Sequence, residues 1–443
     1  MQQARRALGR MLPRGRFLRR LTMVSGSFAL GQVIVLASSP ILTRLFSPED
    51  FGVYAVFTAL SGLMGLVLAL RYEIAVPLAV SESEAANLAG VTLLLTALST
   101  LLSIPLVWLV TDWLAALTGM PALTRVLWLL PLTMALSGLA QFLNFWSIYR
   151  GTFRLDASSR VLQSLVQSAL QVFLGWVGSG PVGLVAGYGI AYGARTANFA
   201  IRLQPADWTL LCSARPRAMA HLAVKHWRYP AFSAPSTLLQ GCTQLLPAIL
   251  LATLYGPAVA GWFGLGQRLI GLPVRLLGQA ASQVFLGEMA ARKGANGFQL
   301  FRKASLIFFT LGVAIMAPLV IAGPQLFAMI FGESWRTAGE ITRLLVPLYL
   351  TRFVVTPISQ TLNVYGRQSL HLLSSSLDAL LLATTYTVAW TFRLEPLTTV
   401  FLFSFGSSLA FLLYFWFAYQ AARDSLPGRP DGRSNGPRDR PGN

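Results

Sequence analysis

The stretch that indicates the fold class is residues 304–323, ASLIFFTLGVAIMAPLVIAG, which carries no charged side chain. A run of this length can cross the hydrocarbon core of a bilayer as one helix. Similar apolar blocks recur along the 443-residue chain, which is 54% hydrophobic and only 12% charged. A soluble domain carries about twice that charged fraction. We therefore predict an all-α polytopic membrane protein.

Apolar blocks separated by short polar turns predict about 12 transmembrane helices. The predicted spans are 21–45, 52–79, 86–111, 123–149, 159–178, 181–203, 230–255, 258–286, 304–323, 340–364, 367–392 and 397–420. They divide into an N-terminal six-helix lobe over 21–203 and a C-terminal six-helix lobe over 230–420. We expect a basic cytoplasmic tail over 1–20, a cytoplasmic linker over 204–229 and a tail over 421–443. This last tail is rich in Pro, Gly, Arg and Asp, which predicts disorder.

The positions of the basic residues predict the orientation in the membrane. With these spans, 26 of the 35 Lys and Arg residues fall on the side of the two termini and 4 on the opposite side. Cytoplasmic loops carry such an excess, so both termini are predicted to be cytoplasmic, in a cell inner membrane. The net charge of the chain is +19. The basic residues lie mainly in alternate loops and in the tails and form no continuous basic face, which argues against nucleic-acid binding.

Two segments about half a chain apart repeat one pattern. Leu45-Phe46-Ser47-Pro48 followed by Gly52-Val53-Tyr54 matches Leu254-Tyr255-Gly256-Pro257 followed by Gly261-Trp262-Phe263. In both, one predicted helix ends, a proline-containing turn follows, and a glycine lies near the start of the next helix. Two six-helix halves of the same orientation explain such a repeat, because six spans return the chain to its starting side.

Several strings resemble the polysaccharide-biosynthesis flippases of the multidrug/oligosaccharidyl-lipid/polysaccharide exporter superfamily. They are Gly31-Gln32, the run from Pro40 through Pro48-Glu49-Asp50-Phe51-Gly52, Arg71-Tyr72-Glu73-Ile74-Ala75, Gly261-Trp262-Phe263, Gln267-Arg268, Pro273 and Ser282-Gln283-Val284-Phe285. The resemblance implies two lobes around a central cavity that opens alternately to the two sides. It also implies a substrate, an oligosaccharide repeat unit on a polyprenyl pyrophosphate, moved for O-antigen, capsule or exopolysaccharide synthesis.

Charged residues inside spans are costly in a bilayer and usually face a cavity or a partner. Five arginines lie within the predicted spans, against two clear acids. Arg268 and Arg275 are seven residues apart and share one face of a regular helix, and Arg352 is about as deep in its own span. Arginine can bind a pyrophosphate bidentately, so these three are candidate cavity residues. The alternative is that they pair with a neighbouring helix or extend to the surface.

The resemblance favours a functional role for Arg71 and Glu73, while a structural tether between lobes stays open. Two residues apart, they face different sides of a continuous helix and should not pair with each other. Asp378 could pair with an arginine or bind a coupling ion, H⁺ or Na⁺. We find no motif for a metal, a cofactor or ATP hydrolysis, and expect a monomer whose partners are membrane lipids and the lipid-linked glycan.

Two other functions compete with a flippase. A cation-coupled multidrug exporter of the same superfamily would need buried acids, which are scarce here. A membrane glycan polymerase would be an enzyme and would need a large external loop carrying reactive side chains, whereas the longest predicted external loop covers 324–339. The sequence therefore favours a non-enzymatic flippase.

The charge bias yields a test of topology. Reporter fusions at Ser213 and Ala295 should report a cytoplasmic position, and fusions at Thr118 and Ser334 an external one, because basic loops stay on the cytoplasmic side. If Ser213 and Ser334 report the same side, the predicted twelve-span topology is wrong.

Overall fold

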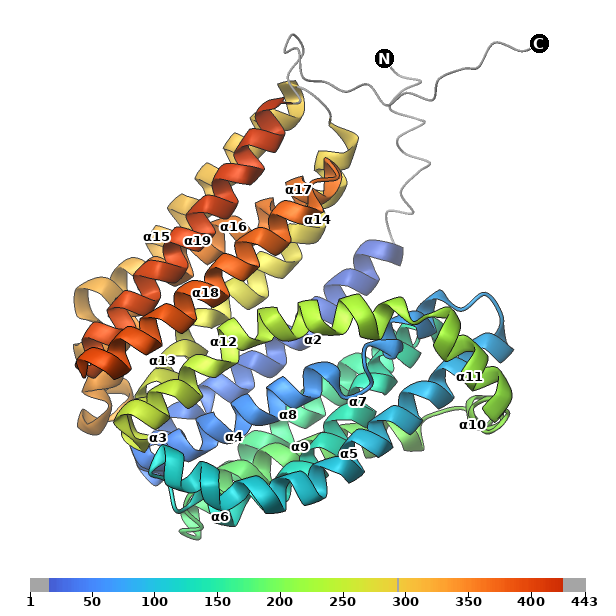
Figure 1. The fold of residues 1–443 in the computed structure, drawn as a ribbon, viewed down its shortest axis with the longest axis horizontal. Helices are drawn as coiled ribbons and strands as arrows, with labels where there is room; N and C mark the ends of the chain where they lie inside the picture. The colour runs from blue at the N-terminus through green and yellow to red at the C-terminus, as the bar shows by residue number, and fades with distance from the viewer. Residues whose placement is uncertain (1–15, 293–294, 425–443) are drawn as a thin grey trace. The chain divides into compact units, whose positions relative to one another are not determined.

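The computed structural model describes residues 16–292 and 295–424 and shows helices and turns, with no strand among those residues. Most of the predicted basic tail and of the predicted disordered tail lies outside the described residues. Every one of the predicted spans contains helix (Figure 1), although within the predicted span 52–79 the α-helix ends at Val67 and a turn separates it from the 3₁₀ helix Tyr72–Leu78. Eight stretches of described helix are long and apolar enough to cross a membrane. The other predicted spans coincide with α8, α9, α13–α14 and α18, which are also helical.

The N-terminal half contains α2 (Arg16–Ala37), α3 (Ser39–Leu45), α4 (Pro48–Val67), α5 (Glu82–Thr118), α6 (Leu123–Val126), α7 (Leu130–Arg150), α8 (Phe153–Trp176) and α9 (Pro181–Ile201). Helix α8 packs along both α2 and α9. The predicted cytoplasmic linker folds into α10 (Pro205–Cys212) and α11 (Pro216–Lys225), which pack on α5.

The C-terminal half contains α12 (Ala234–Tyr255), α13 (Pro257–Pro273), the π-helical turn η4 (Val274–Gly278), α14 (Gln279–Ala291), α15 (Ala295–Phe331), α16 (Arg336–Ile358), α17 (Gln360–Val364), α18 (Gln368–Phe392) and α19 (Pro396–Asp424). Helix α12 packs against α4 (Figure 1). Ala322 interrupts α15 with a non-helical conformation, close to the predicted end of that span.

The described chain divides into two compact units. The first contains residues up to 269 together with 322–343 and 386–399, and the second contains 270–321, 344–385 and the residues from 400 onward. Helices α13, α15, α16, α18 and α19 therefore each contribute to both units. The predicted lobe boundaries, 21–203 and 230–420, stay a prediction.

Each unit has its own apolar core. In the first unit Val56, Phe57 and Leu123 are fully buried in a cluster of residues from α4, α5, α6, α7, α9, α12 and α13. In the second unit Phe301 and Ile358 lie in a cluster built by α14 to α17 and α19. The outward surfaces of many helices stay apolar, which suits contact with lipid.

The two copies of the sequence repeat meet inside the first unit. Helices α4 and α13 begin at Pro48 and Pro257, and their first turns cross with direct backbone contact. A Cβ atom on Gly52 would lie 1.9 Å from the carbonyl oxygen of Pro257, and a Cβ on Gly261 would lie 1.9 Å from that of Pro48. The contact is thus reciprocal, and only glycine fits at either position. A capping box between Ser47 and Asp50 determines where α4 begins.

Other contacts surround this crossing within the first unit. The Trp335 side chain is fully buried, donates its indole N–H to the Thr43 carbonyl at 3.1 Å, and packs edge-on against Phe51. Tyr255 donates its hydroxyl to the Leu394 carbonyl at 2.8 Å. Segments far apart in sequence are therefore joined at the ends of the helices that are predicted to face outward.

Gly52→Ala should lower the stability of the purified protein by about 1–3 kcal/mol, because the added methyl group forces the two backbones apart. Gly65→Ala in the same helix is the matched control, since a Cβ there meets nothing within 4 Å. It should leave stability unchanged or raise it by about 1 kcal/mol through helix propensity. Thermal unfolding in the same detergent measures the stability of both variants. Equal melting temperatures for the two variants would contradict the close contact between α4 and α13.

Candidate functional site

Arg268 extends from α13 toward the N-terminal helices of its unit. Its Nη2 donates to the Val35 carbonyl of α2 at 3.4 Å, and that oxygen also accepts from the hydroxyls of Ser38 and Ser39. Tyr54 of α4 lies near this guanidinium. Arg268 therefore ties α13 to α2 within the first unit.

Neutral polar side chains continue from Tyr54 into the first unit. Gln167 of α8 donates its amide to the Tyr54 hydroxyl at 3.3 Å. The Tyr54 ring meets the Tyr188 ring edge-on, and the hydroxyls of Tyr188 and Tyr192 on α9 lie 3.3 Å apart. Aromatic and amide groups of this kind can bind sugar hydroxyls and ring faces. The sequence did not indicate this cluster, because its members lie on three separate helices.

A buried ion-pair network joins α8, α9 and α7. Asp156 accepts from Arg160 Nε and from Arg195 Nη2, each at 2.8 Å, and Arg160 also donates to Asn144 at 2.6 Å. Asp156 is 3% exposed and Arg195 8%. Both arginines lie within helices, Arg160 on α8 and Arg195 on α9, and the side of the membrane on which they lie stays a prediction. The four-residue spacing of Asp156 and Arg160 was the available signal.

Arg71 and Glu73 correct another prediction. Helix α4 ends at Val67, Leu70 and Arg71 adopt left-handed backbone conformations, and a 3₁₀ helix, Tyr72–Leu78, follows. Because the predicted continuous helix does not exist here, the side chains meet, with Arg71 Nη1 3.6 Å from Glu73 Oε1. The expectation that they do not pair was wrong.

Glu73 is buried beyond the end of α4, outside that helical span, and accepts the Gln141 amide at 2.8 Å. The pair ties the turn after α4 to α7, both in the first unit. A functional role for Arg71 and Glu73 and a tether between lobes both stay predictions.

Arg275 and Arg352 belong to the second unit. Arg275 lies in η4, and a Cβ on Gly271 would meet its Nη1 at 3.2 Å and a ring carbon of Tyr349 at 3.3 Å. Arg352 places its guanidinium carbon 5.3 Å from the ring centre of Phe411 on α19, a cation–π geometry. The shared face of Arg268 and Arg275 assumed a regular α-helix, whereas a π-helical turn changes the angular spacing of its residues.

Asp378 is a buried acid on α18 of the second unit. Its Oδ1 accepts the Ser407 hydroxyl of α19 at 2.7 Å, and the residue is 8% exposed. Among the described residues, no three His, Cys, Asp or Glu side chains gather closely enough to hold a metal ion. The predicted role of Asp378 in ion coupling stays a prediction, as does the convergence of Arg268, Arg275 and Arg352 on one cavity.

Comparisons with known proteins match the sequence to one family and the fold to several solved structures. A profile of the family described as polysaccharide biosynthesis protein matches residues 41–340. An inward-facing multidrug resistance transporter of the MATE family, in the MOP superfamily, superposes with a TM-score of 0.70 at 16% identity, covering 89% of this chain and 96% of that one. The lipid II flippase MurJ, in an inward closed conformation, superposes with a TM-score of 0.72 at 11% identity, covering 90% and 87%.

A variant of the Vibrio cholerae MATE transporter VcmN gives a TM-score of 0.60 at 16% identity, covering 92% of this chain and 97% of that one. Among curated proteins, none matches this sequence significantly. At these identities the structural likeness shows the fold. These transporters have a 12-helix fold, which confirms the predicted all-α polytopic class.

Asp156→Asn should destabilise the protein by about 3–5 kcal/mol, because it leaves the buried Arg195 without its carboxylate partner. Asp112→Asn is the matched control, since Asp112 is an exposed residue of α5 and exposed charges contribute little. Thermal unfolding of the purified variants measures the difference. If the Asp156→Asn variant has the same melting temperature as the Asp112→Asn control, the ion-pair network contributes no stability.

Proposed function

Because this chain belongs to the polysaccharide biosynthesis protein family, we propose that it flips a polyprenyl-pyrophosphate-linked oligosaccharide repeat unit across the inner membrane by alternating access. The protein is a multi-span membrane transporter of that family. The proposal adds the substrate: a glycan unit destined for a cell-surface polysaccharide. Both termini are taken to be cytoplasmic and the working unit to be a monomer.

The position of Arg268 is the observation that carries this proposal. A guanidinium within a predicted membrane span has a high desolvation cost, which an anionic ligand can offset. Its hydrogen bond to the Val35 carbonyl positions the side chain within the first unit. A pyrophosphate offers oxygens in the spacing that a guanidinium recognises bidentately. The nearby Gln167, Tyr188 and Tyr192 are suited to the attached sugars.

We include Arg275 and Arg352 of the second unit as further candidates for binding phosphate. The Phe411 ring holds the Arg352 guanidinium through its face, which leaves the in-plane N–H donors available to phosphate. Asp378 is the candidate for coupling transport to H⁺ or Na⁺. Its burial and its bond from Ser407 allow one carboxylate to hold a proton or a small cation.

The second candidate function is a cation-coupled multidrug exporter. Asp378 is the specific observation in its favour, since exporters of cationic compounds need a buried acid. The five predicted intramembrane arginines argue against it, because a basic cavity repels cationic drugs. A glycan polymerase is weaker still, since no large external loop interrupts the described helices.

Arg268→Ala and Arg352→Ala should each abolish most surface polysaccharide in cells that depend on this protein, while the protein still inserts at normal abundance. Lysine at either position should restore export only in part, because an ammonium lacks the bidentate fork. Arg215→Ala, in an exposed loop, is the control and should export normally. Surface glycan, accumulated lipid-linked intermediate and protein abundance are measured together.

Two outcomes would count against this assignment. Normal export from a well-expressed Arg268→Ala, Arg352→Ala double variant would exclude both arginines from substrate binding. A parallel fall in export and abundance would instead assign them a structural role between helices.

A further inference from the structure

A groove in the second unit lies between α15, α16 and α19. It has a volume of about 760 Å³, within the range of small-molecule sites. Apolar side chains form most of it, among them Leu306 and Phe309 of α15, Leu350 of α16 and Leu412 of α19. None of the arginines proposed to bind the glycan substrate lines it. The inference below therefore does not rest on the proposed function.

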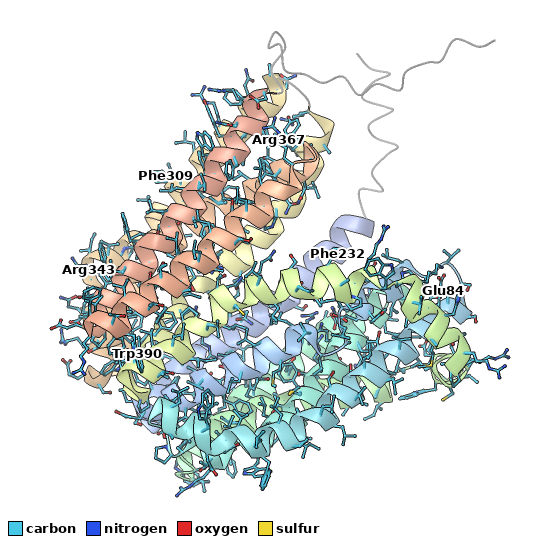
Figure 2. The ribbon with its side chains drawn as sticks, in the orientation of Figure 1. Glu84, Phe232, Phe309, Arg343, Arg367 and Trp390 are labelled. Atoms are coloured by element: carbon cyan, nitrogen blue, oxygen red, sulfur yellow. The ribbon has the colours of Figure 1, made fainter. Side chains whose placement is uncertain are left out.

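Aromatic packing holds the walls of the groove in place. Phe301 of α15 is 1% exposed and stacks against Phe415 and Tyr419 of α19, with ring centres 5.6 and 6.2 Å away. The rim differs from these walls, because Leu306, Phe309 and Leu412 are each at least half exposed. Figure 2 labels Phe309 on α15. The groove is thus preformed, and its mouth is apolar.

One end of the groove is basic. Arg302 and Lys303 line it near the start of α15, are both exposed, and have Gln299 and Tyr419 beside them. Of the described residues that line the groove, none is acidic. Phe309 is seven residues along α15 from Arg302, about 10 Å at the rise of an α-helix. The positive charge at one end matches the phosphate head group of an anionic lipid, and the apolar channel beyond it matches an acyl chain.

We propose that this groove binds an anionic phospholipid of the bilayer. Its phosphate contacts Arg302 and Lys303, and an acyl chain lies along Leu306, Phe309, Leu350 and Leu412. Basic pockets at the ends of transmembrane helices recognise anionic head groups in this way. A zwitterionic lipid gains less, because its own cation repels the two basic side chains. The bound lipid bridges α15, α16 and α19, and so stabilises their packing.

Native mass spectrometry of the purified full-length protein tests the proposal. With added phosphatidylglycerol, wild-type protein should retain lipid, and the Arg302→Gln, Lys303→Gln double variant should bind it about tenfold more weakly. Phosphatidylcholine should bind both proteins weakly and equally. Arg215→Gln with Arg217→Gln is the matched control, since it removes the same charge from exposed residues elsewhere and should bind like wild type.

The Ser305→Trp variant distinguishes lipid binding in the groove from head-group binding at the charged surface alone, because the tryptophan fills the apolar channel and both basic residues remain. The Ser305→Trp variant should also bind phosphatidylglycerol about tenfold more weakly than wild type. The melting temperature of each variant is measured to confirm that it is folded. If the Ser305→Trp variant is unfolded, the result of the Arg302→Gln, Lys303→Gln variant alone tests the proposal. Unchanged binding by the charge variant overturns the proposal. So does full retention by a folded Ser305→Trp variant, which would indicate surface head-group contact only. Displacement of phosphatidylglycerol by equimolar farnesyl diphosphate would instead identify a prenyl-lipid site and overturn it.

Discussion

A peptide group within the hydrocarbon of a bilayer has no water to bond with, and the whole structure depends on this constraint. Each span must satisfy its backbone internally, which a helix does. The breaks in helical geometry are local, and they include the left-handed residues after α4, the π-helical turn η4 and the distortion at Ala322. Each of these changes which side chains can meet.

Close backbone approach is the second means by which this chain holds its helices together. Between helices in lipid there is little hydrophobic driving force, so small residues that allow tight packing are favoured. Gly52 and Gly261 allow such tight packing reciprocally, because the Cα of each lies against the carbonyl of the proline that begins the other helix. A repeat in sequence thereby becomes a symmetric contact in space.

Buried charged residues of this chain have two kinds of surroundings. Asp156, Arg160 and Arg195 neutralise one another in part and lock α8 to α9, whereas Arg268 donates to a backbone carbonyl of α2. The first arrangement is suited to stability, because breaking it would leave a buried charge unpaired.

The sequence by itself determined the membrane class, the positions of the spans and the family resemblance, because apolar length and local motifs act through the bilayer one helix at a time. Only the tertiary structure decided that Arg71 contacts Glu73, that Arg195 is buried against Asp156, and that Gly52 meets Gly261. The groove beside Arg302 also arises from three separate helices. Such contacts depend on where a helix breaks and which helix lies beside it, and neither is a local property of the chain.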